Sequence, residues 1–241
     1  MAGSTKKRPL ASGEVHVWLA DVDAAAGRGA EPEDLSREEW ARSARLRFDV
    51  DRGRFVARRA LLRRLLGDYL GVAPEEVVLE SEERGKPRVV SPDRTASLEL
   101  SLSASGGLCV YAFAPGRAVG VDLELVRADL DVMSVARRAL PRERADLLEA
   151  LPPRLRPAAF FADWVDVEAR VKLSGEGLAG LDPTHGEDRC TTVTALSVPN
   201  GYVAALALDG PPAAIIERRW PEDALGWDSV AARWPGRDSA R

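Results

Sequence analysis

The order of predicted elements repeats along the chain, and this repetition constrains the fold more than any other feature. Apolar periodicity predicts a strand, a short helix, a long helix and further strands in residues 14–113, and the same order follows in residues 118–208. Mixing strands with helices in this way is typical of α/β proteins. We therefore expect an α/β fold of two similar halves related by a pseudo-two-fold axis, with a ligand-binding cleft between them.

Four segments follow from this order. We expect a disordered leader in residues 1–13, an N-terminal α/β half in 14–117, a C-terminal α/β half in 118–209, and an extension rich in Trp and Pro in 210–241. Three tryptophans in the extension are seven residues apart, at positions 220, 227 and 234. This spacing is typical of an amphipathic helix packed onto the protein body, which we favour over a stacking platform for a ligand.

Strands and helices are predicted at definite positions within each half. In the N-terminal half we expect strands at 15–19, 77–79, 97–103 and 108–113, helices at 36–48 and 52–70, and a loop at 21–33. In the C-terminal half we expect a strand at 118–125, helices at 132–140, 141–151 and 157–173, and a hairpin of 191–197 with 202–208. The segment 97–103, SLELSLS, alternates polar and apolar residues, which predicts a half-exposed strand.

Composition excludes several classes of protein. The chain has only two histidines and two cysteines among 241 residues, and they lie far apart, which argues against a zinc site or a disulfide framework. A net charge of −4 gives no basic field for general nucleic-acid binding. No apolar run approaches the roughly 18 residues of a membrane span, and the basic leader lacks the apolar region of a secretory signal. We expect a cytoplasmic protein.

Two carboxylates lie two residues apart in the segment Gly120-Val121-Asp122-Leu123-Glu124. Because alternate residues of a strand project from one face, Asp122 and Glu124 point the same way. A solvated strand face would explain the pair, but the apolar neighbours Val121 and Leu123 indicate a mostly buried strand. Oxygen ligands without His or Cys favour Mg²⁺ over zinc.

Glu168 and Lys172 are four residues apart on the predicted helix at 157–173, so they share a face. An ordinary surface ion pair, worth about 0.3–0.5 kcal/mol, would explain them. The helix around them, FFADWVDVEARVKL, has few charges before Glu168, which indicates partial burial. A third carboxylate beside Asp122 and Glu124 would complete an oxygen site for Mg²⁺.

Several groups elsewhere could hold an anion. Each has an ordinary explanation, because helical arginines are normally solvated and SASGG is normally a turn. Together they provide cations and hydroxyls of the kind that bind phosphate. They are Arg59 and Arg63 on one helix face, Lys86 in a Gly-Lys-Pro turn, and Ser103 at the start of SASGG.

In this order the motifs resemble those of the Sfp-type 4′-phosphopantetheinyl transferases, over about residues 14–208. The resemblance rests on R-x-x-x-R at 59–63, GKP at 85–87, LSASGG at 102–107, GVDLE at 120–124, and W-x-x-x-E-A-x-x-K-x-x-G-x-G-L at 164–178. It implies a pseudo-dimer of two α/β halves with coenzyme A in the cleft between them. It also implies an enzyme that transfers phosphopantetheine from coenzyme A to a serine of an acyl or peptidyl carrier protein, releasing adenosine 3′,5′-bisphosphate.

The resemblance also assigns roles to individual residues. It implies Mg²⁺ ligands at Asp122, Glu124 and Glu168, with Glu168 also the general base for the carrier serine and Lys172 beside the phosphates. Coenzyme A contacts are implied at Arg59, Lys86 and Ser103, and we group Arg63 with them because it shares the helix face of Arg59. A duplicated chain has less need of a second copy, so we expect a monomer.

Three positions depart from the family pattern. Ala104 replaces a phosphate-binding histidine, and Val165 and Val167 replace the Thr and Lys of the Trp-Thr-x-Lys-Glu-Ala motif. Losing one charge-assisted hydrogen bond costs about 1.5–3 kcal/mol. Two alternatives to a working transferase therefore stay open. One is a repurposed enzyme that acts on a carrier-bound, coenzyme A-bound or small-molecule substrate, and the other is a non-catalytic module that binds carrier proteins.

Overall fold

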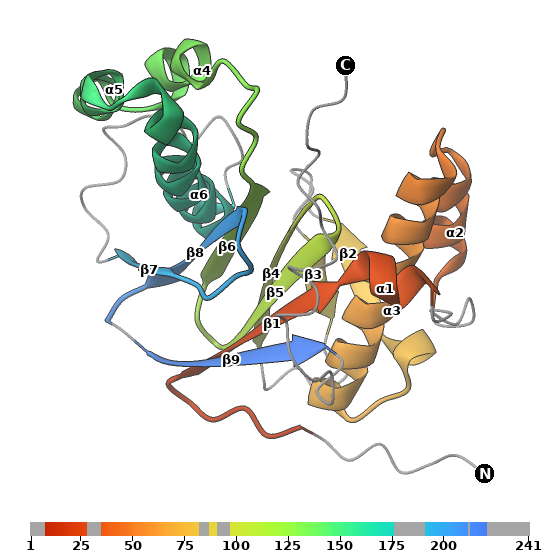
Figure 1. Ribbon diagram of the computed structural model, residues 1–241. Helices are drawn as coiled ribbons and strands as arrows, with labels where there is room; N and C mark the ends of the chain where they lie inside the picture. Colours follow the sequence, from red (N-terminus) through yellow and green to blue (C-terminus); the bar gives the residue numbers. More distant parts are fainter. Residues whose placement is uncertain are drawn as a thin grey trace.

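The structure of the chain, a computed structural model, describes residues 8–27, 35–81, 87–90, 97–175, 191–211 and 213–220. Its elements form a mixed α/β fold, as the sequence predicts (Figure 1). Within the described residues, no helix combines the length and the apolar character that crossing a bilayer requires. The site motif Gly85-Lys86-Pro87 falls largely outside these ranges, and so do His185, Cys190, Trp227 and Trp234.

The N-terminal half has one main sheet and one long helix. Its elements are β1 (Glu14–Asp21), α1 (Val22–Gly27), α2 (Arg37–Ala44), α3 (Asp49–Leu70), η2 (Pro74–Glu76), β2 (Val78–Ser81), β3 (Pro87–Val90), β4 (Leu98–Ser105) and β5 (Leu108–Pro115). Strands β4, β5 and β1 pair antiparallel in that order, and β2 pairs with β3 separately. The predicted helix at 52–70 ends as expected, because Gly71 adopts a left-handed φ of 73°. Helix α1 and strand β3 were not predicted.

The C-terminal half has a smaller sheet and a second long helix. Its elements are β6 (Val119–Leu125), α4 (Val132–Ala139), α5 (Arg142–Ala150), η3 (Pro153–Leu155), α6 (Arg156–Ser174), β7 (Thr191–Ala195) and β8 (Tyr202–Asp209). The sheet order is β6-β8-β7, with antiparallel pairs. In both halves the first strand pairs with the last strand of a hairpin. This correspondence is consistent with the duplication, which stays a prediction.

The extension does not begin with the expected helix. Ala214–Trp220 form strand β9, which pairs in parallel with β1 and adds a fourth strand to the N-terminal sheet. For residues 214–220 the expected helix is thus replaced by a strand, whereas Trp227 and Trp234 lie outside the described residues, so the helix around them stays a prediction. Trp220 does pack onto the body, edge to face with Trp18 at a ring separation of 6.3 Å.

The end of the expected leader contacts the N-terminal half. The backbone N–H of Arg8 donates to the carbonyl of Asp68 at 2.6 Å, and the Arg8 guanidinium lies 4.6 Å from the centre of the Trp18 ring. Leu10 packs against the same apolar cluster. The predicted disorder therefore does not extend to residues 8–13.

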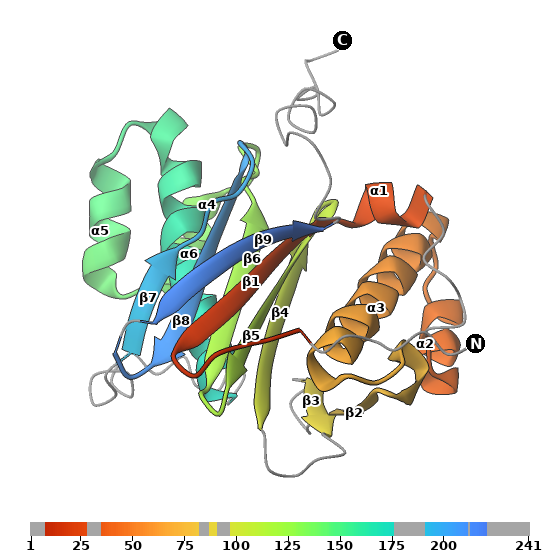
Figure 2. The ribbon, with the colours of Figure 1, turned by 90° about the horizontal axis from the view of Figure 1, so that it is seen from below.

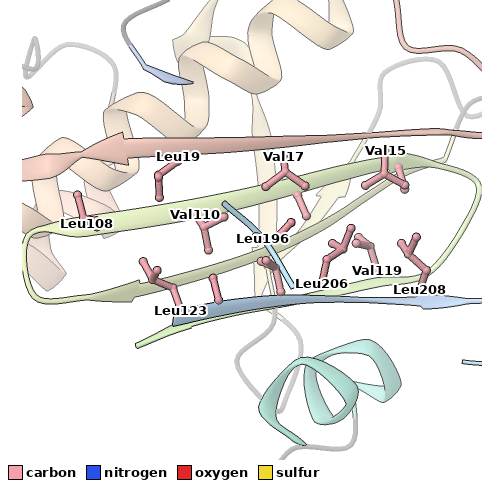
Figure 3. Close-up of a cluster of buried hydrophobic side chains, with 14 residues drawn as sticks. Val15, Val17, Leu19, Leu108, Val110, Val119, Leu123, Leu196, Leu206 and Leu208 are labelled. Atoms are coloured by element: carbon pink, nitrogen blue, oxygen red, sulfur yellow. The ribbon is translucent and has the colours of Figure 1, made fainter. Parts of the chain in front are cut away.

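The two sheets face one another between the two long helices (Figure 2). Alternate residues of β1, β5, β6 and β8 meet in a buried apolar layer, in which Val17, Val110 and Leu206 are almost fully buried (Figure 3). The opposite face of β1 and β5 packs on α3, and the opposite face of β8 packs on α6. Strands β1, β5 and β8 are thus buried on both faces, which explains their continuous apolar character.

Strand β4 is more buried than its alternation predicts. Its polar residues Ser101 and Ser103 are only 2% and 8% exposed, because they face β6 of the other half rather than solvent. Ser101 Oγ accepts a hydrogen bond from the N–H of Val121 at 3.0 Å, and Ser105 Oγ accepts one from Leu125 at 3.0 Å. Serine hydroxyls therefore satisfy the β6 edge where no strand pairs with it.

Gly120 allows α6 to lie directly against β6. A Cβ atom at this position would stand 2.0 Å from the carbonyl oxygen of Ala169 and 2.5 Å from the nitrogen of Leu173. Both are backbone atoms of α6, so no side-chain rotation could relieve the overlap. The glycine of the GVDLE motif therefore sets the distance between the strand that carries Asp122 and the helix that carries Glu168 and Lys172.

We expect Gly120→Ala to lower the free energy of unfolding by at least about 1–3 kcal/mol, because α6 must move away from β6. Urea denaturation measures the loss. Gly53→Ala is the matched control, since its added Cβ would meet only the Cβ of Ala26, at 3.7 Å, and alanine favours the interior of α3. Equal stability of the two variants would contradict the close approach at Gly120.

Candidate active site

Asp122 and Glu124 lie on the face of β6 that α6 covers, next to β4. Asp122 is 3% exposed, and its Oδ1 accepts a hydrogen bond from Ser103 Oγ at 2.7 Å. Glu124 Oε2 accepts one from Ser105 Oγ, also at 2.7 Å. The two carboxylates share one face, as their spacing predicts, and each is held by a serine from the other half of the protein.

Helix α6 brings two further charged groups to this face. Lys172 Nζ donates to Asp122 Oδ1 at 2.6 Å. Glu168, one turn earlier, is partly buried, and its pKa is raised above the ordinary value, first by burial and then by the neighbouring Asp122 carboxylate. Lys172 opposes this rise in the pKa of Glu168, and Glu124 adds to it. The structure thus brings together the four residues Asp122, Glu124, Glu168 and Lys172.

One atom of this cluster has no partner among the described residues. Asp122 Oδ2 is buried and makes no hydrogen bond, although Oδ1 of the same carboxylate accepts two. A buried carboxylate oxygen without a donor is costly, and a bound cation would satisfy it. The donor set, carboxylate oxygens only, matches the preference of Mg²⁺.

The carboxylates are not arranged as a closed metal site. In the part of the chain that the structure describes, no three His, Cys, Asp or Glu side chains are grouped closely enough to hold a metal ion. The positive charge next to Asp122 belongs to Lys172 instead. The predicted magnesium ligands therefore remain a prediction, with the orphaned oxygen of Asp122 in its favour.

Arg63 does not lie in a position to bind an anion, contrary to the sequence-based expectation. Its side chain is 5% exposed, and its Nε donates to Glu39 Oε2 at 2.6 Å. One terminal nitrogen donates to the carbonyls of Val77 at 2.9 Å and Pro74 at 3.2 Å. Arg63 is thus a buried structural cation that ties α2, α3 and η2 together. The spacing of Arg63 from Arg59 does not reveal this, because the spacing does not show whether the shared helix face is exposed or buried.

Arg59 shares the same acidic partner but is more exposed. Its Nε lies 2.7 Å from Glu39 Oε1, close enough for an ion pair but without hydrogen-bond geometry, and its side chain is 20% exposed. Its predicted contact with coenzyme A stays a prediction. Ser103 touches Asp122 and has no described ligand role, and Lys86 lies outside the described residues.

The departures at Val165 and Val167 lie in apolar clusters. Val165 is 2% exposed and packs with Ala169, Ala205 and Ala207 between α6 and β8. Val167 packs against the apolar cluster formed by α4, α5 and the start of α6. Both valines therefore stabilise the C-terminal half, so they are weak support for a repurposed site.

Ala104 lies on the other face of β4 from Ser103. It packs against the apolar cluster beneath α3, whereas Ser103 faces Asp122. A side chain at position 104 therefore points toward α3 and away from Asp122. The loss of a histidine here changes that side and leaves the hydrogen bonds of Asp122 and Glu124 in place.

The described structure holds a cavity away from the carboxylate cluster. A cavity of about 430 Å³ lies against β1, β5, β9 and the segment after β7, with Val17, Leu19, Val110 and Leu196 among its lining residues. None of its lining residues is a predicted site residue. The cavity lies between residues of both halves, and the predicted cleft that holds the site residues stays a prediction.

Comparison with known proteins identifies the family. No protein-family model matches the chain. The chain is 39% identical over 175 residues to 4′-phosphopantetheinyl transferase HetI of Nostoc sp., covering 72% of this chain and 73% of that protein. It is 28% identical over 164 residues to a putative 4′-phosphopantetheinyl transferase of Synechocystis sp., covering 68% and 66%, respectively. It is 31% identical over 145 residues to 4′-phosphopantetheinyl transferase psf-1 of Bacillus pumilus, covering 60% of each chain.

The chain belongs to the 4′-phosphopantetheinyl transferase family. This confirms the resemblance found in the motif order. As a family member the chain is a transferase, and the non-catalytic alternative loses its support. The four clustered residues are the ones that the motifs GVDLE and W-x-x-x-E-A-x-x-K placed at the site.

Sequence reasoning missed the serines and the glycine that position this cluster. The sequence motif places Ser105 only in an anion-binding turn. It does not predict the contacts of Ser101 and Gly120 with β6 and α6. The alternation of β4 shows that the serines share a face. It does not show that β6 covers this face, because pairing between distant strands leaves no local signal.

We expect Arg63→Met to cost about 3–5 kcal/mol of stability, since it leaves Glu39 buried with one arginine fewer. Arg142→Met is the control, because that side chain is 94% exposed in a loose pair with Asp146 and its loss should cost at most about 1 kcal/mol. Urea denaturation compares the two variants. Native stability in Arg63→Met together with weakened coenzyme A binding would restore the anion-binding role.

We expect Glu168→Gln to stabilise the metal-free protein at neutral pH. The pKa of Glu168 is raised, so folding favours its protonated form, and this stabilisation is complete below the ordinary value of 4.5 and lost as pH rises through the raised value. The glutamine variant should gain about 0.5–2 kcal/mol at pH 7, a difference that shrinks toward pH 4.5.

Urea unfolding in the presence of a chelator, between pH 4.5 and pH 8, measures this difference. Glu143→Gln is the control, because Glu143 is exposed in the first turn of α5. A Glu168→Gln variant less stable than the wild type at pH 7 would show that the carboxylate is not strained by its neighbours.

Proposed function

We propose that the protein catalyses the Mg²⁺-dependent transfer of 4′-phosphopantetheine from coenzyme A to a serine of an acyl or peptidyl carrier protein. The observation that carries this proposal is the cluster of Asp122, Glu124, Glu168 and Lys172, which α6 and β6 bring together in a chain of this family. Three carboxylates and one lysine close together can bind a cation and a phosphate. The names of the relatives, 4′-phosphopantetheinyl transferases, indicate the group that is transferred.

The reaction exchanges a phosphoanhydride bond of coenzyme A for a phosphate ester bond to the carrier serine. The carrier serine Oγ forms a bond to the phosphorus that carries pantetheine. The bond from that phosphorus to the bridging oxygen of the pyrophosphate breaks, and adenosine 3′,5′-bisphosphate leaves. A serine hydroxyl is a poor nucleophile, so its proton must pass to a base within hydrogen-bond reach, directly or through one water.

Glu168 is suited to act as this base. Burial and the Asp122 carboxylate raise its pKa, and a carboxylate with a raised pKa accepts a proton more readily. Lys172 on the next turn opposes the rise in the pKa of Glu168. In this scheme the proton of the serine ends on the Glu168 carboxylate.

The other charged residues hold the phosphates and the metal. Asp122 and Glu124 would ligate the ion through oxygens that Ser103 and Ser105 orient. A bound Mg²⁺ would neutralise the charge that builds on the leaving phosphate. Lys172 adds a compact point charge that can contact a phosphate oxygen from any direction, and Arg59 would contact coenzyme A elsewhere.

We expect the protein to add one phosphopantetheine to an apo carrier protein in the presence of coenzyme A and Mg²⁺, with intact-protein mass spectrometry of the carrier as the measurement. Glu168→Gln should lower the rate by about 10²–10⁴-fold, the usual contribution of a general base. A metal chelator should stop the reaction, and added Mg²⁺ should restore it.

Glu143→Gln, on the exposed surface of α5, is the control and should keep the wild-type rate. An established member of the family should be run in parallel on the same carriers. If that enzyme modifies several carriers and this protein modifies none, the proposed activity is wrong and a different substrate must be sought for the site.

A further inference from the structure

The most informative contact in the site is the pairing of Lys172 with Asp122. Lys172 Nζ lies 2.6 Å from Asp122 Oδ1, and Asp122 is the most buried carboxylate of the cluster. The Lys172 ammonium therefore neutralises the most buried of the three proposed metal-binding carboxylates. Oδ2 of the same group has no hydrogen-bond partner among the described residues, so the lysine satisfies only part of the carboxylate.

A lysine and a divalent cation on one buried carboxylate repel each other. Repulsion between charges this close is weakly screened, because Asp122 lies in the protein interior. A metal that ligates Asp122 is therefore disfavoured while Lys172 donates to it. Movement of Lys172 to another anion would remove this repulsion and leave both oxygens of Asp122 open to a metal.

The side chains allow such a move. The Lys172 side chain is 29% exposed, whereas that of Asp122 is 4% exposed and stays fixed by Ser103 Oγ. A lysine has a flexible four-carbon stem and a rotatable ammonium, so it can swing from a carboxylate to a nearby phosphate. The backbone of α6 need not move, since its close contact with Gly120 already fixes it against β6.

We propose that Lys172 is an internal counterion that occupies Asp122 before the substrate arrives and moves to the pyrophosphate of coenzyme A when it binds. The move frees Asp122 for the metal, so coenzyme A and Mg²⁺ bind with positive coupling through this lysine. The inference rests on the proposed function and deepens it, because it gives the site an order of assembly. It makes Lys172 a positioning residue for the metal as well as a phosphate contact.

Calorimetric titration of Mg²⁺ into the full-length protein, with and without coenzyme A, tests the proposal without any carrier protein. In the wild type, coenzyme A should tighten Mg²⁺ binding by a factor in the usual range of allosteric coupling, about 5–150-fold. Lys172→Met should bind Mg²⁺ alone at least about fivefold more tightly than the wild type, and the tightening by coenzyme A should fall at least about fivefold.

Arg170→Met is the matched control. Arg170 is exposed, lies on the same helix two residues from Lys172, and carries the same charge toward Asp166 instead of Asp122. It should leave both Mg²⁺ affinities at the wild-type values. Thermal unfolding gives a second readout, because Lys172→Met leaves Asp122 without its cation and added Mg²⁺ should raise its Tm more than that of the wild type.

If Lys172→Met does not fold, Lys172→Gln takes its place, since the amide can still donate to Asp122 without a charge. Mg²⁺ affinities in the Lys172 variant that equal those of Arg170→Met would overturn the counterion role, even if the wild type transfers phosphopantetheine. Wild-type protein that binds Mg²⁺ with the expected coupling but modifies no carrier would contradict the proposed function and leave the counterion role standing.

Discussion

The close contact between α6 and β6 at Gly120 determines the geometry of the candidate site. Because a Cβ atom at Gly120 would overlap the backbone of α6, the helix can approach the strand this closely only at a glycine. Ala169, Ala205 and Ala207 continue the same thin layer toward β8. The result is that Lys172, on the last turn of α6, reaches a carboxylate on β6 by a direct hydrogen bond of 2.6 Å.

The N-terminal half contributes to the same site through β4. Its serines satisfy the free edge of β6 and also donate to Asp122 and Glu124. One set of hydroxyls thus joins the two halves and orients the carboxylates, which explains why polar residues lie in a nearly buried strand. The orientation of the two carboxylates therefore depends on contact between the halves. A change that separates the sheets would also remove the hydrogen bonds that hold Asp122 and Glu124.

Local patterns in the sequence predicted most of the fold and the central residues of the site. The two long helices, the strand at 118–125 and the hairpin that follows were placed to within a few residues, because each has a strong apolar period. Strand β9 was not predicted, since it depends on a distant partner, β1. The burial of the Arg63 side chain could not be predicted either, because its partners, Glu39 and two carbonyl groups, come from other elements.

The charges of the candidate site are unbalanced within the described residues. Three carboxylates share one lysine, a buried oxygen of Asp122 has no partner among the described residues, and the pKa of Glu168 is raised. Such an arrangement lowers stability, so the apolar layer between the sheets and the layer between β8 and α6 must hold it together. A cation would relieve all three features at once, and a phosphate would give Lys172 a second partner. Under the proposed function, a divalent cation and a phosphate are the two kinds of ligand that would relieve these features. Under the proposed counterion role of Lys172, binding of each would prepare the site for the other.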